Sequence, residues 1–233
     1  MTAPSALGAR ALAEALGTGL LVAVIVGSGM QAQRLSPGDI GLQLLENSTA
    51  SALALVALIF CLGPVSGAHL NPAVTLTERL TGKIDTPTTG AYICAQVAGG
   101  CAGTIAANLM FDLSPVDWST TNRATGAVAF SEVLATFGLL TMIIGVARSG
   151  RHAAMPLAVA AYIGAAYWFT SSTGFANPAV TIARTLTDTF AGIAPGSVPA
   201  FVAAQLTGAL LAVGVARVLF TGPDPSLEEV LDA

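Results

Sequence analysis

The chain contains the same five residues twice, as Asn71-Pro72-Ala73-Val74-Thr75 and as Asn177-Pro178-Ala179-Val180-Thr181. Each copy stands at the end of a hydrophobic stretch. Asn is a preferred helix N-cap, and Pro at the first helical position costs little because the N–H at that position would be unpaired anyway. Both copies therefore predict the start of a short helix. Two such helix starts that meet head to head would form a path for a solute.

Composition predicts an integral membrane protein. Apolar residues make up 54% of the chain and charged residues 9%, with a mean hydropathy of +0.74, whereas a soluble domain is about a quarter charged. The 233 residues are enough for six spans of about 20 residues each. We therefore expect a single membrane domain over residues 1–233. The net charge is −4, with an acidic C-terminal tail, which gives no reason to expect nucleic acid as a partner.

Apolar runs predict six transmembrane helices and place the two motifs between them. Residues 66–80 and 171–188 are short and rich in small residues, and they contain the motifs. They predict re-entrant half-helices, which a membrane tolerates where they line a cavity inside protein. The predicted fold is an all-α membrane protein of six transmembrane helices plus two half-helices. The six spans lie near 7–30, 49–65, 88–110, 126–147, 154–170 and 197–220.

The two halves of the chain, about 7–110 and about 126–220, resemble each other. Glu14 and Glu132 occupy matching positions in the first span of each half, and Gln96 and Gln205 match in the last. Each half has three spans, so the second half enters the membrane from the opposite side, which makes an inverted repeat. The two half-helices would then meet near the middle of the membrane.

Lys and Arg in the connections predict the orientation, because cytoplasmic loops carry an excess of these residues. With the N-terminus inside, six of the nine cations are cytoplasmic and three are outside. We therefore expect a multi-pass protein of the inner (plasma) membrane with both termini cytoplasmic. The cytoplasmic cations would be Arg10, Arg79, Lys83, Arg148, Arg151 and Arg217, and the outer ones Arg34, Arg123 and Arg184.

With these motifs the chain resembles the major intrinsic protein family, the aquaporins and aquaglyceroporins, over residues 7–220. The resemblance implies an aquaporin-like right-handed bundle and a homotetramer with one pore in each subunit. It is carried by Glu14, the stretch Ser66-Gly67-Ala68-His69-Leu70-Asn71-Pro72-Ala73-Val74-Thr75, Gln96, Glu132, and Asn177-Pro178-Ala179.

The two half-helices predict which solutes pass. Each presents its N-terminus, with unpaired N–H groups and a partial positive charge, to the middle of the membrane. A cation would meet a desolvation cost and the repulsion of two dipoles there, whereas a neutral solute can accept hydrogen bonds from the amides of Asn71 and Asn177. We expect a passive channel for water and small neutral solutes that excludes ions and protons.

Three titratable residues inside the apolar segments have alternative roles. A carboxylate in a membrane span is costly and can mark a proton relay. The matching positions of Glu14 and Glu132 favour a structural role instead, in which each accepts hydrogen bonds from backbone N–H groups of a re-entrant loop. His69 precedes the first motif and is predicted either to line the cytoplasmic side of the pore or to be a hydrogen-bonded structural residue.

The expected selectivity filter departs from the family pattern. Val180 follows the second motif where water channels and glycerol facilitators of the family have Arg. Counting from the motifs assigns the other positions to Ser51, to Ala165 or its neighbour Ala166, and to Gly174 with Phe175. Such a filter would be wide and weakly polar unless Phe175 turns inward.

Residues 180–184 read Val-Thr-Ile-Ala-Arg. This stretch resembles an aquaglyceroporin subgroup linked to bacterial arsenic resistance, which implies arsenite or methylated arsenicals beside glycerol-like polyols as solutes. Arg184 lies one helical turn beyond Val180, so its side chain can lean back toward the outer vestibule. The alternative, which the sequence favours, is surface pairing with Asp188 one turn further on.

Two other function classes fit the sequence less well than a channel. A proton- or ion-coupled secondary transporter of a small neutral solute would fit the inverted repeat and the two buried acids, but the sequence has no signature of an Na⁺ site. An enzyme is not expected, because the two His and three Cys form no nucleophile–base or metal constellation. We therefore expect no metal and no cofactor.

Overall fold

The computed structural model describes residues 6–221. The acidic C-terminal tail noted in the sequence lies outside these residues. The chain is folded into α-helices joined by short connections and 3-10 turns. The helices are α1 (Leu7–Leu35), α2 (Ile40–Ser66), α3 (Pro72–Leu80), α4 (Thr86–Met110), α5 (Gly126–Arg148), α6 (Met155–Phe169), α7 (Pro178–Ala183) and α8 (Val198–Leu219), and the 3-10 turns are η1 (His152–Ala154), η2 (Arg184–Leu186) and η3 (Pro195–Ser197).

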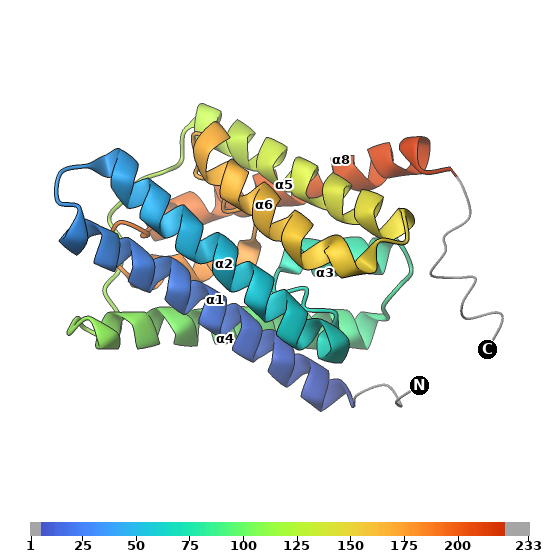
Figure 1. The fold of residues 1–233 in the computed structure, drawn as a ribbon, viewed down its shortest axis with the longest axis horizontal. Coiled ribbons are helices and arrows are strands. Elements are labelled where there is room, and N and C mark those ends of the chain that lie inside the picture. Colours follow the sequence, from blue (N-terminus) through green and yellow to red (C-terminus); the bar gives the residue numbers. More distant parts are fainter. Residues whose placement is uncertain (1–5, 222–233) are drawn as a thin grey trace.

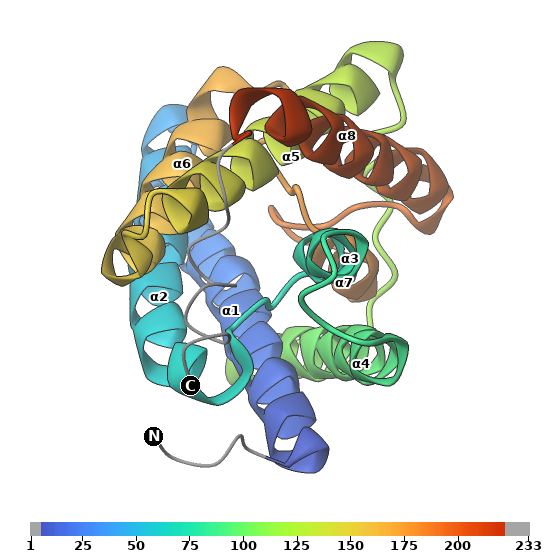
Figure 2. The same ribbon diagram turned by 90° about the vertical axis from the view of Figure 1, so that its right-hand side faces the viewer.

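Six long helices surround two short ones. In the end-on view of Figure 2, α3 and α7 lie one behind the other in the middle, with α1, α2, α4, α5, α6 and α8 around them. Figure 1 shows that α1 begins and α8 ends at the same end of the bundle. The six spans and two half-helices predicted from the sequence are therefore confirmed as an aquaporin-like fold. Because the number of spans is even, the start of α1 and the end of α8 lie on the same side of the bundle.

Local sequence explains where the helices begin and end. Asp39, Asp85 and Thr125 cap α2, α4 and α5 by accepting hydrogen bonds from backbone N–H groups of the first turn. Gly67 ends α2 in the left-handed conformation at φ 86°. Among the described residues, five helices are long and apolar enough to cross a membrane by themselves. The sixth, α6, has 15 residues and is extended at its start by η1.

The packing repeats between the halves. α1 packs on α4 and α2, while α5 packs on α8 and α6. Glycines allow the closest approach: a Cβ at Gly99 would collide with the carbonyl of Ala15, and a Cβ at Gly208 with the carbonyl of Val133. Small residues of this kind let membrane helices pack backbone to backbone. The half-helices are held inside the frame that these pairs build.

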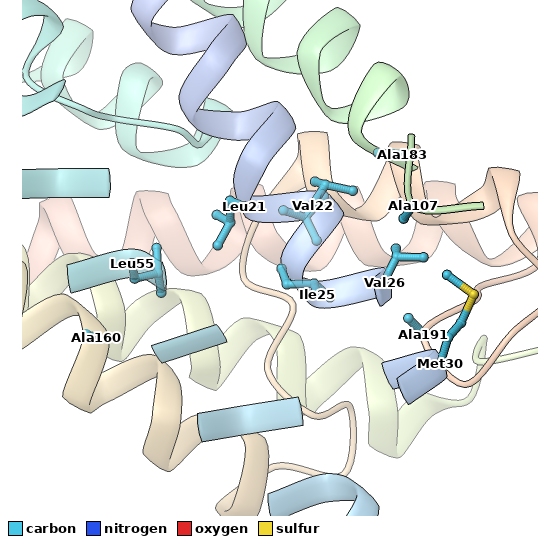
Figure 3. Close-up of a cluster of buried hydrophobic side chains, with 11 residues drawn as sticks. Leu21, Val22, Ile25, Val26, Met30, Leu55, Ala107, Ala160, Ala183 and Ala191 are labelled. Atoms are coloured by element: carbon cyan, nitrogen blue, oxygen red, sulfur yellow. The ribbon is translucent and has the colours of Figure 1, made fainter. Parts of the chain in front are cut away.

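A cluster of apolar side chains forms part of the interior. It joins α1, through Leu21 and Ile25, with Leu55 of α2 and Val180 of α7. Figure 3 shows how the α1 side chains of this cluster extend toward neighbouring elements. The same four residues also line the main cavity of the protein. One side of α1 thus serves both as core and as an apolar cavity wall.

The close contact of α1 with α4 gives a stability test. We expect Gly99→Ala to lower the free energy of unfolding by about 1–3 kcal/mol, the usual cost of overpacking. Gly90→Ala, in the same helix, has open space around the added Cβ and is the matched control, expected to be neutral or slightly stabilising. Thermal unfolding of the purified variants in detergent measures both. Equal melting temperatures for the two variants would contradict this account of the packing.

Candidate pore

Each half-helix is preceded by a loop whose backbone is held in an unusual conformation. Leu70 and Ala176, the residues just before the two motifs, have φ angles of 49° and 47°. Residues with a side chain pay roughly 1–2 kcal/mol for this left-handed conformation. Because the loops lie inside the bundle and carry unpaired backbone groups, side chains of neighbouring helices must hold them.

Glu14 of α1 holds the first loop. Its Oε1 accepts hydrogen bonds from Ser66 Oγ at 2.6 Å and from the N–H of His69 at 2.9 Å. Its Oε2 accepts from the N–H of Leu70 at 2.7 Å and from Gln96 Nε2 at 2.7 Å. The side chain is completely buried. Both carboxylate oxygens therefore accept hydrogen bonds from the loop, and one of them also accepts from Gln96 of α4.

Glu132 of α5 repeats this arrangement in the second half. Its two oxygens accept from the N–H groups of Phe175 and Ala176, each at 2.9 Å, and from Gln205 Nε2 at 2.6 Å. Gln205 also donates to Thr181 Oγ1 at 2.9 Å, just as Gln96 donates to Thr75 at 3.0 Å. The contacts are those expected of a structural role, which was the interpretation favoured by the sequence.

The two motifs are linked to each other across the middle of the bundle. Asn71 and Asn177 cap α3 and α7, with Oδ1 accepting from the N–H of Ala73 at 2.8 Å and of Ala179 at 3.0 Å. Asn71 Nδ2 donates to the carbonyl of Ala176, and Asn177 Nδ2 donates to the carbonyl of Leu70, both at 2.8 Å. These reciprocal bonds bring the N-termini of the half-helices together.

A cavity of about 660 Å³ passes these motifs. Asn71 and Asn177 both line it, and an amide Nδ2 has two N–H groups, of which the cross-link uses one. His69 lines the cavity as well, with Nδ1 3.1 Å from Thr75 Oγ1 and its ring edge-on to Tyr92. His69 therefore fits both interpretations offered by the sequence, because it lines the pore and is hydrogen-bonded.

The predicted filter positions are only partly brought together. Ser51, Gly174, Phe175 and Val180 all line the cavity. Ala165 does not: it is exposed on α6, and its neighbour Ala166 is buried outside the cavity lining. The α6 residues nearest to Ala165 that do line the cavity are Ile163 and Tyr167. These are one helical turn apart, whereas Ala165, two residues from each, points to the other side of the helix.

Tyr167 is a lining residue that the sequence reasoning missed. Its hydroxyl donates to Ser51 Oγ at 3.0 Å, and Ser51 in turn donates to the carbonyl of Asn47 at 2.8 Å. The only sequence signal was its position, two residues after the alanine chosen by counting. The expectation of a weakly polar filter is corrected by this tyrosine and by Arg184.

Arg184 turns into the cavity rather than to the surface. Only 4% of it is exposed, it lines the cavity, and its guanidinium lies 3.6 Å from the centre of the Phe175 ring. Its Nε donates to the carbonyl of Ala191. The surface pairing with Asp188 favoured by the sequence is therefore wrong. The reason is that the η2 turn and the loop after it place a carbonyl and an aromatic face beside the guanidinium.

Asp188 has other partners. It accepts from the N–H of Thr120 at 2.9 Å and from the Thr120 hydroxyl at 3.0 Å. The hydrogen bonds from Thr120, backbone first, lower the pKa of Asp188. Arg123 approaches Phe175 from outside, with its guanidinium 5.5 Å from the ring centre and its Nε donating to the carbonyl of Gly192 at 2.9 Å. Two cations thus flank one phenylalanine at this end of the cavity.

Comparisons with known proteins agree with this architecture. Residues 3–176 match the family model described as major intrinsic protein. The chain is 50% identical to aquaglyceroporin AqpS of Rhizobium meliloti (strain 1021), over 94% of each chain. It is 32% identical to aquaporin A of Dictyostelium discoideum, over 71% of this chain and 63% of that protein. The solved aquaglyceroporin from Plasmodium falciparum matches with a TM-score of 0.72 at 22% identity, covering 92% of this chain and 97% of that one.

A fold with two facing half-helices around a cavity, together with these matches, defines a membrane channel. The chain belongs to the major intrinsic protein family. Members of this family are channels and not enzymes.

The buried acids give a second test. Glu14→Gln keeps the size of the side chain but replaces one acceptor oxygen by an NH₂ group that faces another donor, the N–H of Leu70 or His69. Hydrogen bonds to a charged group are worth about 1.5–3 kcal/mol each, so we expect the folded yield and the melting temperature to fall markedly.

Thr18→Val is the control for this test. Thr18 is buried in the same helix, and its hydroxyl has no hydrogen-bond partner in the described part of the chain. Loss of stability in Glu14→Gln, well beyond that in Thr18→Val, supports the structural role. A Glu14→Gln protein of normal stability that has lost a proton conductance present in the wild type would instead support a proton relay.

Proposed function

We propose that this protein is a passive channel for water and small neutral hydroxylated solutes, and that it excludes ions and protons. The observation that carries the proposal is the meeting of Asn71 and Asn177 at the cavity, each at the N-terminus of a half-helix. The solutes would include glycerol-like polyols and the neutral hydroxides of arsenic, arsenite and methylated arsenicals. The general statement that the protein is a channel for water and glycerol-type solutes is supported by its similarity to an aquaglyceroporin.

Ion exclusion follows from the electrostatics of the two helix ends. Each N-terminus carries about half a positive charge, and both are directed at the same point of the cavity. A cation there loses its hydration and is repelled. A water molecule that accepts hydrogen bonds from both Asn side chains has its oxygen oriented by two donors, which interrupts a continuous proton wire.

The outer part of the cavity supports a preference for neutral solutes with several hydroxyl groups. Among residues 6–221, Arg184 donates a hydrogen bond only through Nε, so its two Nη groups remain available to a solute in the cavity. Phe175 and Val180 supply apolar contact beside it. A solute that presents an apolar edge and several acceptor oxygens fits this lining, as glycerol and arsenite both do.

The alternative, an ion- or proton-coupled transporter, requires a carboxylate that can exchange protons or bind an ion. Glu14 and Glu132 are the buried acids of the described chain, and both are saturated by donors from the loops and from Gln96 and Gln205. This arrangement favours the channel. We further propose a homotetramer with one pore in each subunit, in the inner membrane with both termini cytoplasmic, on the resemblance and on the distribution of Lys and Arg.

The proposal is tested by stopped-flow flux measurements on liposomes that contain the purified protein. We expect permeability to water, glycerol and neutral arsenite that does not saturate or depend on an ion gradient, with no proton current above empty vesicles. Asn177→Asp, which places a negative charge at the helix ends, should admit cations. Coupling of solute flux to a proton or Na⁺ gradient would overturn the channel, and a folded Asn177→Asp channel that stays closed to cations would overturn the dipole account.

Arg184 gives a sharper prediction about the filter. We expect Arg184→Ala to raise glycerol permeability several-fold while water permeability changes little, because the guanidinium occupies the lumen beside Phe175. Val180→Arg should reduce glycerol flux more than water flux, because two guanidinium groups would then share the space.

Arg123→Ala is the matched control, because this cation also faces Phe175 but does not line the cavity. The ratio of glycerol to water permeability, measured on the same preparation, is the readout. An unchanged ratio in Arg184→Ala and Val180→Arg, at normal protein yield, would place the constriction elsewhere along the cavity.

A further inference from the structure

A second cavity, of about 620 Å³, lies apart from the two motifs. It is formed where α1 begins, where α3 gives way to the turn before α4, and where α4 begins. This is the end of the bundle that faces the viewer in Figure 2. In a membrane channel the ends of the spanning helices lie at the level of the lipid headgroups, so the cavity opens to headgroups and to water.

The cavity is basic. Its lining contains three cations, Arg10, Arg79 and Lys83, and one carboxylate, Asp85. Asp85 Oδ1 is engaged as the cap of α4, accepting from the N–H of Thr88 at 2.9 Å. Within residues 6–221, neither Arg10 nor Arg79 forms an ion pair. The lining of the cavity therefore carries more positive than negative charge.

The two guanidinium groups are positioned by threonines of the same wall and keep donors free. Arg10 Nη2 lies 3.5 Å from Thr88 Oγ1, and Arg79 Nε donates to Thr86 Oγ1 at 3.2 Å. Each guanidinium has five N–H donors, so most remain available. Arg10 Nε, moreover, is buried without a hydrogen-bond partner in the described chain. Several Arg donors converging on one cavity with a cationic Lys match the oxygens of a phosphate group.

Lys83 connects this cavity to the pore. Lys83 lines both cavities. Its Nζ forms an ion pair with Glu78 Oε1 at 3.4 Å, and Glu78 lines the pore cavity but not the basic one. An anion in the basic cavity would compete with Glu78 for the same ammonium group. The strength of anion binding therefore depends on Glu78, although this carboxylate is not part of the basic cavity.

We propose that the basic cavity formed by Arg10, Arg79 and Lys83 binds a phosphate group. The group comes either from an anionic lipid headgroup at this membrane surface or from phosphate in solution. The proposal is independent of which solutes the pore conducts, so its test measures binding and not flux.

The experiment uses the full-length purified protein with two probes. In the lipid arm, native mass spectrometry compares adducts of phosphatidylglycerol with adducts of phosphatidylcholine. In the phosphate arm, thermal unfolding is followed with inorganic phosphate against chloride at equal ionic strength, because surface electrostatics are screened by salt. Adducts selective for phosphatidylglycerol alone identify a lipid site. A rise in melting temperature with phosphate identifies a site for phosphate in solution.

Variants locate the binding. Arg10→Gln with Arg79→Gln should weaken binding by about fivefold for each Arg removed, the usual weight of one cation near an anionic surface. Glu78→Gln should strengthen binding several-fold, because Lys83 loses its competing partner. Arg151→Gln with Arg217→Gln is the matched control, which removes two exposed cations that do not line the cavity.

Opposite effects of the Arg pair and of Glu78→Gln are the result we expect, and a general loss of fold would not produce them. The Arg151 and Arg217 pair separates them from an effect of net charge, because it removes the same two charges away from the cavity. The proposal is overturned if neither probe binds the wild type selectively. It is equally overturned if the control pair weakens binding as much as the Arg10 and Arg79 pair.

Discussion

Backbone that is not helical can exist inside a membrane only if its polar groups find partners in the protein or in a water-filled cavity. The two loops before the motifs meet this demand in the middle of the bundle, and the rest of the structure depends on how they do so. Glu14 and Glu132 each accept two backbone N–H groups from one loop. Burying two carboxylates costs desolvation energy, but the hydrogen bonds that each acid accepts from the backbone and from a glutamine offset this cost. The same bonds hold the loop residues that have left-handed φ angles.

The same constraint shapes the pore. Because Leu70 and Ala176 are left-handed, their carbonyls turn toward the opposite half-helix, where Asn177 and Asn71 donate to them. Each Asn therefore uses its Oδ1 as a helix cap and one N–H as a cross-link, which leaves the second N–H for the cavity. Two helix ends are fixed head to head by bonds that are internal to the protein. The hydrogen bonds that hold the loops thus also place two amide donors at the cavity.

The features that the sequence predicted well are those with local or periodic signals. Hydropathy located all six spans to within a few residues except for α2, whose polar start at Ile40 precedes the apolar run that begins at 49. The repeated motif located both half-helices, and the matching positions of Glu14 and Glu132 predicted the groups to which they bind. The position of Ala165 failed because the rotation of α6 about its axis is set by packing, and one or two residues in the count move a side chain to the opposite face.

The direction of the Arg184 side chain could not be predicted for a different reason: it is set by tertiary contacts that a local charge pattern does not show. A pattern of opposite charges one turn apart favours pairing with Asp188, but Thr120, from the connection before α5, occupies that carboxylate. The loop after η2 instead brings the Ala191 carbonyl to the guanidinium, and Phe175 covers its face. An unpaired cation is tolerated there because an aromatic face and a carbonyl replace part of its hydration. Val180 supplies no cation where the resemblance led us to expect an Arg, but a guanidinium from the next turn, that of Arg184, lines the same cavity.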